Sequence, residues 1–265
     1  LHGFGQDEKY FVKAAPAIDR AIVEGRVPPV IVACPDGTTQ NKPALLSKQS
    51  WFINSRLGRY EDFVVIDVWD FLNARFMLRP EREAHVLAGV SMGGASAFNL
   101  GIKHRDRFAV VAGMMPILNP WYADCHGDHF APFDPDCQGD KPYRPLAKAG
   151  RIGPITIRSY SALRPLFGSR TEVETRGRTE NPTEMLDLYD VRPGQLQMFI
   201  GYGSNDQFNG GAEAESFLYR AGLRGINAEV AVDPQGRHNR DTAKRLFVPF
   251  TKWLAPLLAP YAPAP

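Results

Sequence analysis

Gly89-Val90-Ser91-Met92-Gly93 follows an apolar run at residues 85–88 and precedes a helix-like run at residues 94–100. This arrangement predicts a buried strand, a sharp turn that carries a serine, and a helix. Such a turn needs glycine on both sides of the serine, because the strand and the helix pass too closely for a Cβ atom. We therefore expect a strained turn that holds the Ser91 hydroxyl clear of the sheet, at a helix N-terminus. The pentapeptide alone is not specific, since an ordinary glycine-rich turn also fits it.

Apolar, β-branched runs alternate with helical patterns along most of the chain. This alternation favours an α/β fold, a mostly parallel sheet with helices on both faces. A length of 265 residues with 44% hydrophobic residues fits a single domain over residues 1–265. The expected strands are residues 29–35, 85–91, 108–115, 196–202 and 226–232. The expected helices are residues 8–24, which Pro16 should interrupt and kink, 60–76, 92–104, 211–221 and 242–258.

The alternation fails over residues 119–181, where Pro, Gly, Asp and Arg dominate. This segment follows the strand after the serine turn, and ligands of open α/β sheets bind beyond the carboxyl ends of strands. We expect it to be an insertion or lid within the domain. The opening Leu1-His2-Gly3 reads as the end of a strand, so the N-terminal strands of the sheet are expected to be missing from this sequence.

Charge and hydropathy restrict the partners. The net charge is +2 from 31 basic and 29 acidic residues, without a dense Lys/Arg block, so nothing favours nucleic acid. No apolar run is long enough for a membrane span. We expect a small-molecule partner, and the oligomeric state is not indicated.

Two of the three cysteines, Cys125 and Cys137, flank a polar loop. They are either a disulfide, which would favour a secreted or periplasmic location, or unrelated thiols. With His126 and His129 they are also possible zinc ligands, but the spacing matches no common zinc finger. Residues 134–140 resemble the start of a calcium loop that lacks its final glutamate. The sequence therefore predicts no metal ion.

A nucleophilic serine needs a base within hydrogen-bond reach and an acid that orients the base. His238 follows the last strand pattern, and Asp206 follows the one before it. The order Ser91, Asp206, His238 therefore places all three candidates at carboxyl ends of late strands. Asp233 is the rival acid, but it lies only five residues before His238.

An oxyanion intermediate also needs backbone N–H donors. Met92 N–H at the serine turn is one candidate, and Phe4 N–H in the loop at residues 2–5 is the other, which leaves His2 a structural role. Aromatic residues near the same edge could line an acyl or aromatic pocket, although packing in the core is the commoner role. These residues are Trp51, Trp121 and Phe208.

Several segments of the chain form a recognisable combination. They are Leu1-His2-Gly3-Phe4-Gly5, Ala33-Cys34-Pro35-Asp36-Gly37, Ser50-Trp51-Phe52-Ile53-Asn54-Ser55, Gly58-Arg59-Tyr60-Glu61-Asp62 and residues 89–94, with Asp206 and His238. Together they resemble the Putative esterase family of α/β-hydrolases, which includes feruloyl esterases, S-formylglutathione hydrolase and the mycobacterial mycolyltransferases. The similarity spans nearly the whole chain except residues 119–181. It implies the α/β-hydrolase fold, the triad and the two oxyanion donors named above.

The leading hypothesis is a serine carboxylesterase that needs no cofactor and forms an acyl-enzyme on Ser91. The resemblance points to feruloyl or acetyl esters, small or linked to carbohydrate. A second hypothesis passes the acyl group to a sugar or another alcohol, as the mycolyltransferases do. A third is a carbohydrate-binding module on a hydrolase scaffold without turnover, since a fold does not guarantee an activity.

Overall fold

A four-stranded parallel sheet forms the centre of the protein in a computed structural model that describes residues 1–39, 49–140, 146, 148–152 and 155–263. The strand order is β10-β9-β4-β3. Because all four strands are parallel, their carboxyl ends share one edge of the sheet. The strands are β3 (Val86–Val90), β4 (Val110–Met114), β9 (Gln197–Gly203) and β10 (Glu229–Asp233).

The main chain of Leu1 lies along the outer edge of β3. Its nitrogen donates to Ala88 O at 2.6 Å, and its carbonyl accepts from Val90 N–H at 3.2 Å. This is the bonding pattern of a parallel neighbour. The segment after Leu1 is thereby brought to the carboxyl end of β3.

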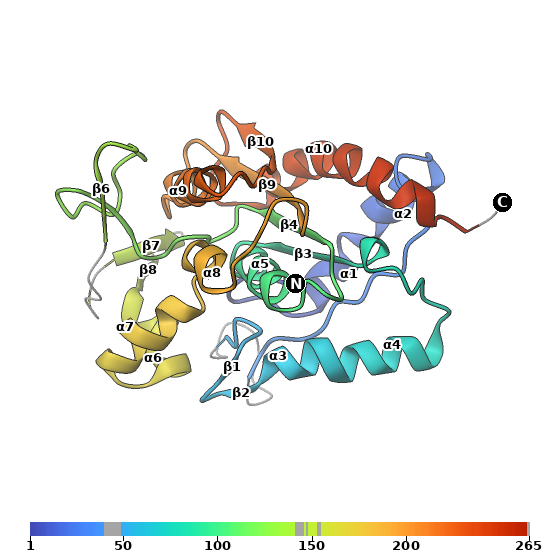
Figure 1. Ribbon diagram of the computed structural model, residues 1–265, viewed down its shortest axis with the longest axis horizontal. Helices are drawn as coiled ribbons and strands as arrows, with labels where there is room; N and C mark the ends of the chain where they lie inside the picture. Colours follow the sequence, from blue (N-terminus) through green and yellow to red (C-terminus); the bar gives the residue numbers. More distant parts are fainter. Residues whose placement is uncertain (40–48, 141–145, 147, 153–154, 264–265) are drawn as a thin grey trace.

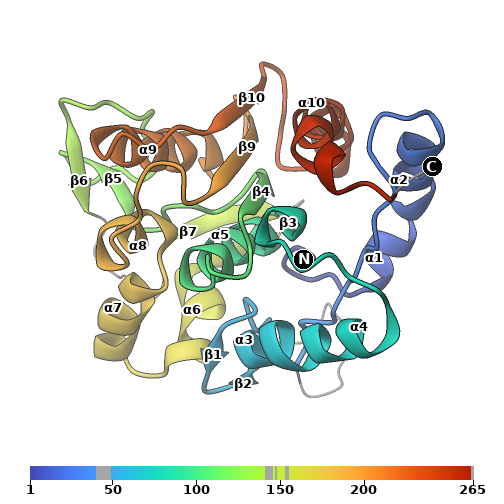
Figure 2. The same cartoon turned by 45° about the vertical axis from the view of Figure 1, so that its right-hand side comes forward.

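Helices cover both faces of the sheet, as the alternation predicts. Val110 faces a hydrophobic cluster shared with α10 (Arg240–Leu258) and α2 (Ala15–Val23), whereas Val111 faces the cluster of α5 (Met92–Lys103) and α9 (Gly210–Leu223). Figures 1 and 2 show α10 and α2 on one side of the strands and α5 on the other. The α5 side also carries α3 (Tyr60–Asp62), which continues through a π-helical stretch, Phe63–Val68, into α4 (Trp69–Arg75). The fold is therefore of the α/β class.

Two expectations for the first 35 residues are wrong. The helix over residues 8–24 is two helices, α1 (Lys9–Val12) and α2, and Pro16 lies in the first turn of α2, where its missing N–H is harmless. Residues 29–35 form no strand, and Val30, Ile31 and Val32 are 37%, 50% and 51% exposed. A β-branched run becomes a strand only beside a partner that supplies hydrogen bonds, and no described residue supplies them here.

The described residues between 119 and 181 contain regular structure. They form two small hairpins and two helices at one end of the molecule (Figure 2). The preceding segment adds the hairpin β1 (Asn54–Ser55) and β2 (Gly58–Arg59), and α8 (Pro182–Leu188) leads back to the sheet. The remaining elements here are β5 (Tyr122–Asp124), β6 (Gln138–Asp140), β7 (Lys148–Ile152), β8 (Ile155–Arg158), α6 (Ser159–Phe167) and α7 (Arg170–Thr179), and two short 3-10 turns elsewhere cover Arg82–Ala84 and Ala259–Tyr261.

A buried ion network joins the end of this segment to α5. Lys103 Nζ lies 2.7 Å from Glu61 Oε2 and 2.6 Å from Glu180 Oε2. The three side chains are only 10%, 13% and 21% exposed. Burial alone would raise the pKa of Glu61, but hydrogen bonds from His104 and Lys103 outweigh it and hold that pKa below its ordinary value. The network therefore favours the ionised carboxylate.

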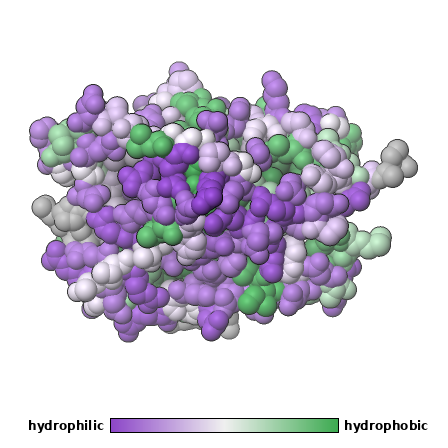
Figure 3. Space-filling model, viewed as in Figure 1, coloured by the Kyte–Doolittle hydropathy of each residue, from purple (hydrophilic) through white to green (hydrophobic). Residues whose placement is uncertain are grey.

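Among the helices described, none combines the length and the apolar character that crossing a membrane requires. The face in Figure 3 is mainly hydrophilic, with hydrophobic residues in small separate groups.

Candidate active site

Ser91 occupies a strained turn between β3 and α5. Its φ and ψ are 56° and −121°, a backbone conformation that non-glycine residues rarely adopt. A Cβ on Gly89 would lie 2.1 Å from Gly93 O, and one on Gly93 would lie 2.2 Å from Leu1 O. Strand, helix and N-terminal segment therefore meet backbone to backbone around the serine, which explains why this turn needs its glycines.

Ser91, His238 and Asp206 form one chain of hydrogen bonds. Ser91 Oγ lies 2.7 Å from His238 Nε2, and His238 Nδ1 lies 2.7 Å from Asp206 Oδ2. Each residue follows a parallel strand: Ser91 comes after β3, Asp206 after β9, and His238 after β10. The side chains of His238 and Asp206 are 12% and 1% exposed, so their hydrogen bond is shielded from water. This geometry lets the imidazole accept the serine proton while the carboxylate holds the Nδ1–H tautomer.

The rival acid is engaged elsewhere. Asp233 Oδ2 accepts a hydrogen bond from Arg245 Nε at 2.6 Å, and Oδ1 accepts from the N–H of Gln235 in the following turn. Asp233 therefore supports the turn and the start of α10, and Asp206 is the carboxylate on the His238 ring.

The residues after Asp206 also contact His238. Gln207 exchanges two hydrogen bonds with the main chain of His238, and the Phe208 ring lies 4.7 Å from the imidazole centroid at an interplanar angle of 53°. The N–H of Phe208 donates to Asp206 Oδ1 at 2.8 Å, so both oxygens of that carboxylate have partners. Phe208, which the sequence suggested as a pocket residue, packs on the candidate base.

The 119–181 segment touches this turn at two points. Asn209 adopts a left-handed conformation with φ 61°, and its Nδ2 donates to the carbonyls of His129 and Ala131 at 3.1 and 2.9 Å. In β7, a Cβ on Gly150 would lie 1.9 Å from the Phe208 ring. The segment therefore packs against the turn that carries Asp206.

The loop expected to supply an oxyanion donor lies beside Ser91. A Cβ on Gly3 would lie 3.5 Å from Ser91 Cβ, so the peptide that leads to Phe4 passes next to the serine. Met92 is the first residue of α5, where helical N–H groups lack an intrahelical acceptor. Within the part of the chain that the structure describes, the N–H groups of Phe4 and Met92 have no hydrogen-bond acceptor. Both are free to bind an anionic oxygen.

The His2 ring holds this loop in place through two hydrogen bonds. It is fully buried, its Nε2 accepts from the N–H of Gly37 at 2.8 Å, and its Nδ1 lies 3.1 Å from the carbonyl of Gly3. These partners require the neutral Nδ1–H tautomer. Burial lowers the pKa of His2 below its ordinary 6.5, which agrees with a neutral ring that holds the Gly3 peptide in place.

Trp51 and Trp121 share a cavity beside α5. The cavity measures about 30 Å³, enough for about two water molecules. Its walls include Ser96 and Asn99 of α5, and the Ser96 hydroxyl donates to the carbonyl of Trp51 at 2.7 Å. The two tryptophans thus lie together next to the helix that begins after Ser91, whereas Phe208 lies on His238.

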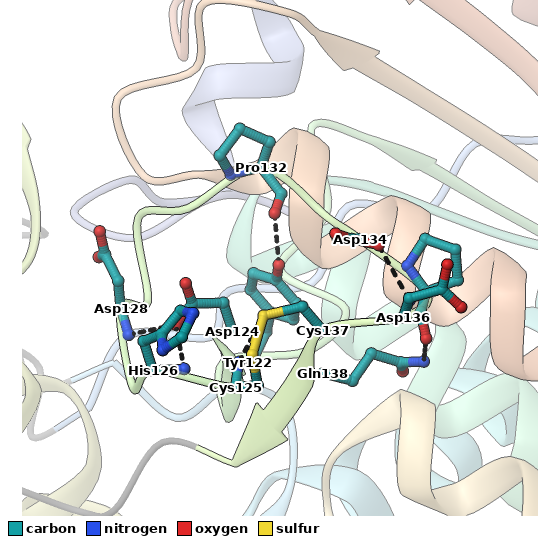
Figure 4. The surroundings of a disulfide bond; sticks show 11 residues. Tyr122, Asp124, Cys125, His126, Asp128, Pro132, Asp134, Asp136, Cys137 and Gln138 are labelled. Carbon is teal, nitrogen blue, oxygen red and sulfur yellow. Dashed lines mark hydrogen bonds between the residues drawn. A yellow bond between two sulfur atoms is a disulfide. The ribbon is translucent and has the colours of Figure 1, made fainter.

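Cys125 and Cys137 form a disulfide at the base of the loop between β5 and β6 (Figure 4). The loop carries its own hydrogen bonds, such as that from Tyr122 OH to Pro132 O at 2.7 Å. With the sulfurs bonded to each other, neither offers a thiolate to a zinc ion, so the disulfide interpretation displaces the zinc one. Cys34 is a free cysteine and half-buried.

Sequence reasoning missed Gln207 and Asn209. Both stand in the turn that gave Asp206, but glutamine and asparagine are common in turns, and their partners lie in other segments. The only available signal was their adjacency to the candidate acid.

Many solved structures have similar folds, and three of them illustrate the likeness. A ferulic acid esterase superposes with a TM-score of 0.67 and 16% identity, covering 97% of this chain and 83% of the other. An S-formylglutathione hydrolase from Agrobacterium tumefaciens gives 0.66 and 16%, covering 97% and 82%. The fluorophosphonate-binding serine hydrolase F of Staphylococcus aureus gives 0.66 and 17%, covering 96% and 81%.

At these identities the superpositions show the fold. The family assignment rests on the sequence itself, because the family model described as "Putative esterase" matches residues 1–250. The chain therefore belongs to the Putative esterase family of α/β-hydrolases, and it is a carboxylic ester hydrolase.

Proposed function

We propose that the protein cleaves carboxylic esters through an acyl-enzyme on Ser91, with His238 as the general base and Asp206 as the residue that orients it. The observation that carries this proposal is the chain of two 2.7 Å hydrogen bonds from Ser91 Oγ through the imidazole to Asp206. A serine hydroxyl is a weak nucleophile unless an adjacent base removes its proton.

The reaction has two halves. Ser91 Oγ attacks the ester carbonyl carbon while its proton passes to His238 Nε2, and the imidazolium then donates that proton to the departing alcohol oxygen. Water attacks the acyl-enzyme in the same way, which releases the acid and restores the serine. The N–H groups of Phe4 and Met92 bind the negatively charged oxygen of each tetrahedral intermediate.

For the substrate we propose feruloyl or acetyl esters, small or linked to carbohydrate. The similarity in fold to a ferulic acid esterase supports this choice. We also propose a secreted or periplasmic location, which the Cys125–Cys137 disulfide supports because disulfides persist in oxidising compartments.

A substrate panel tests the proposal. Acetyl, feruloyl and S-formyl (thio)esters would be offered to the wild-type protein and to Ser91→Ala, with and without an added sugar acceptor. We expect release of free acid by the wild type and a loss of about 10⁴-fold or more in Ser91→Ala. Full activity of Ser91→Ala would refute the assignment of the nucleophile. Acyl-sugar as the main product would instead identify a transferase.

A further inference from the structure

His238 belongs to a loop, and its position is set by a second loop. The carboxyl-end loops after β9 and β10 are joined by main-chain contacts: the N–H of Asn205 donates to Gly236 O at 2.8 Å, and that of Ser204 donates to Asp233 O at 3.0 Å. A Cβ on Gly203 would lie 2.4 Å from Gly236 O. The loops are thus packed backbone to backbone up to the residue before Arg237.

Gln207 extends this pairing to His238 itself. Its Oε1 accepts from the main-chain N–H of His238 at 3.1 Å, and its Nε2 donates to the main-chain carbonyl of the same residue at 3.3 Å. The partners fix the amide orientation, because only an oxygen can accept from the N–H and only the NH₂ group can donate to the carbonyl. The Gln207 side chain therefore satisfies both the main-chain N–H and the main-chain carbonyl of His238.

The two contacts to His238 differ in what they restrain. The Asp206–His238 hydrogen bond restrains the imidazole at Nδ1 but leaves the main chain free to shift with it. The Gln207 amide restrains the main chain from which the imidazole projects. Since Asp206 and Gln207 are adjacent, one segment holds both ends of the histidine residue.

We propose that Gln207 is a positioning residue, which keeps His238 Nε2 within hydrogen-bond reach of Ser91 by clamping the main chain of His238. The inference rests on the proposed role of His238 as the base. A displacement of about 1 Å at a reacting group can lower a rate about 100-fold. Because the clamp sets the position of the base, its loss should lower kcat and leave KM nearly unchanged.

The test compares Gln207→Leu with a matched control, Gln195→Leu. Gln195 is also half-buried, and its Oε1 also accepts a main-chain N–H, from Arg192 at 2.9 Å, but it lies before β9, at the opposite end of that strand. For each variant kcat and KM would be measured on one aryl ester, together with Tm and the downfield NMR resonance of the His238 Nδ1 proton.

We expect Gln207→Leu to lose about 10- to 100-fold in kcat with KM within about twofold, and to shift or broaden the Nδ1 proton resonance. Gln195→Leu should keep the wild-type kcat, KM and Nδ1 proton resonance, and any loss in Tm from its own missing hydrogen bond measures the purely structural effect. A folded Gln207→Leu with wild-type kcat, or one altered only in KM, would overturn the proposal.

If Gln207→Leu does not fold, Gln207→Glu decides. It keeps the acceptor for the His238 N–H but loses the donor to the carbonyl, so a partial loss of kcat is expected and wild-type kcat refutes the clamp. Failure of the proposed function would look different, because Ser91→Ala would then stay active while the NMR comparison of Gln207→Leu could still be made.

Discussion

Replacing Asp206 by asparagine should reverse the tautomer of His238. The carboxylate has two partners: Oδ1 accepts from the N–H of Phe208 at 2.8 Å, and Oδ2 accepts from His238 Nδ1 at 2.7 Å. In Asp206→Asn the side-chain oxygen must stay on the Phe208 N–H, because an NH₂ group there would meet another donor. The NH₂ group then faces Nδ1 and can only donate to it.

A histidine whose Nδ1 accepts carries its proton on Nε2, where it cannot take the proton of Ser91. The same substitution in a serine protease lowers kcat about 10⁴-fold, and we expect a loss of that order here, equal to about 5 kcal/mol in the activation free energy. KM should change little, since the side chain of Asp206 is 1% exposed and lies behind the imidazole.

The assay is steady-state hydrolysis of an aryl ester, with Asp233→Asn as the control. Asp233 pairs with Arg245, so its variant should keep kcat within a few-fold of the wild type. A loss below about tenfold in Asp206→Asn, or equal losses in both variants, would refute the assignment of the acid.

Three further predictions concern stability. Lys103→Met should lower the free energy of unfolding by about 3–5 kcal/mol in urea titrations, because it leaves the carboxylate of Glu61 buried without its cation. Stability should fall as the pH drops below about 6.5, because the pKa of His2 is lowered on folding and the unfolded chain binds that proton at higher pH; in His2→Asn the slope should be shallower. Replacing Cys125 and Cys137 by serine should lower stability by about 2–3 kcal/mol by releasing a short loop.

Each of these three stability predictions has an outcome that would contradict it. An exposed pair, Lys244 with Asp241, is the control for the buried network, and equal effects of Lys244→Met and Lys103→Met would contradict the burial argument. Identical pH curves for the wild type and His2→Asn would show that folding does not change the pKa of His2. For the disulfide, activity should fall together with stability, because Asn209 hydrogen-bonds the loop at His129 and Ala131; unchanged kcat would show that this contact does not reach the site.

The serine turn could be predicted from sequence because its requirements are local. Gly89 and Gly93 lie two residues before and after Ser91, and a Cβ on Gly89 would meet the backbone of Gly93 in the same turn. The approach of Gly93 to Leu1, by contrast, joins segments far apart in the chain. The three site residues could also be placed, since parallel strands bring their carboxyl ends to one edge whichever residues lie between them.

What failed depended on partners far away in the chain. Residues 29–35 have the composition of a strand, but a strand exists only where another segment pairs with it. The clamp by Gln207 needs the main chain of His238, 31 residues later. For Cys125 and Cys137 the sequence left a disulfide and two unrelated thiols open, and only the placement of the sulfurs decides between them.

The most direct test of the catalytic assignment is to trap the acyl-enzyme. The wild-type protein would be mixed with an aryl ester, quenched in acid during the first turnovers, and digested for peptide mass mapping. The account predicts one acyl group, on the peptide that contains Ser91, and none in Ser91→Ala or His238→Ala. An acyl group on another residue, or turnover by Ser91→Ala at the wild-type rate, would contradict it.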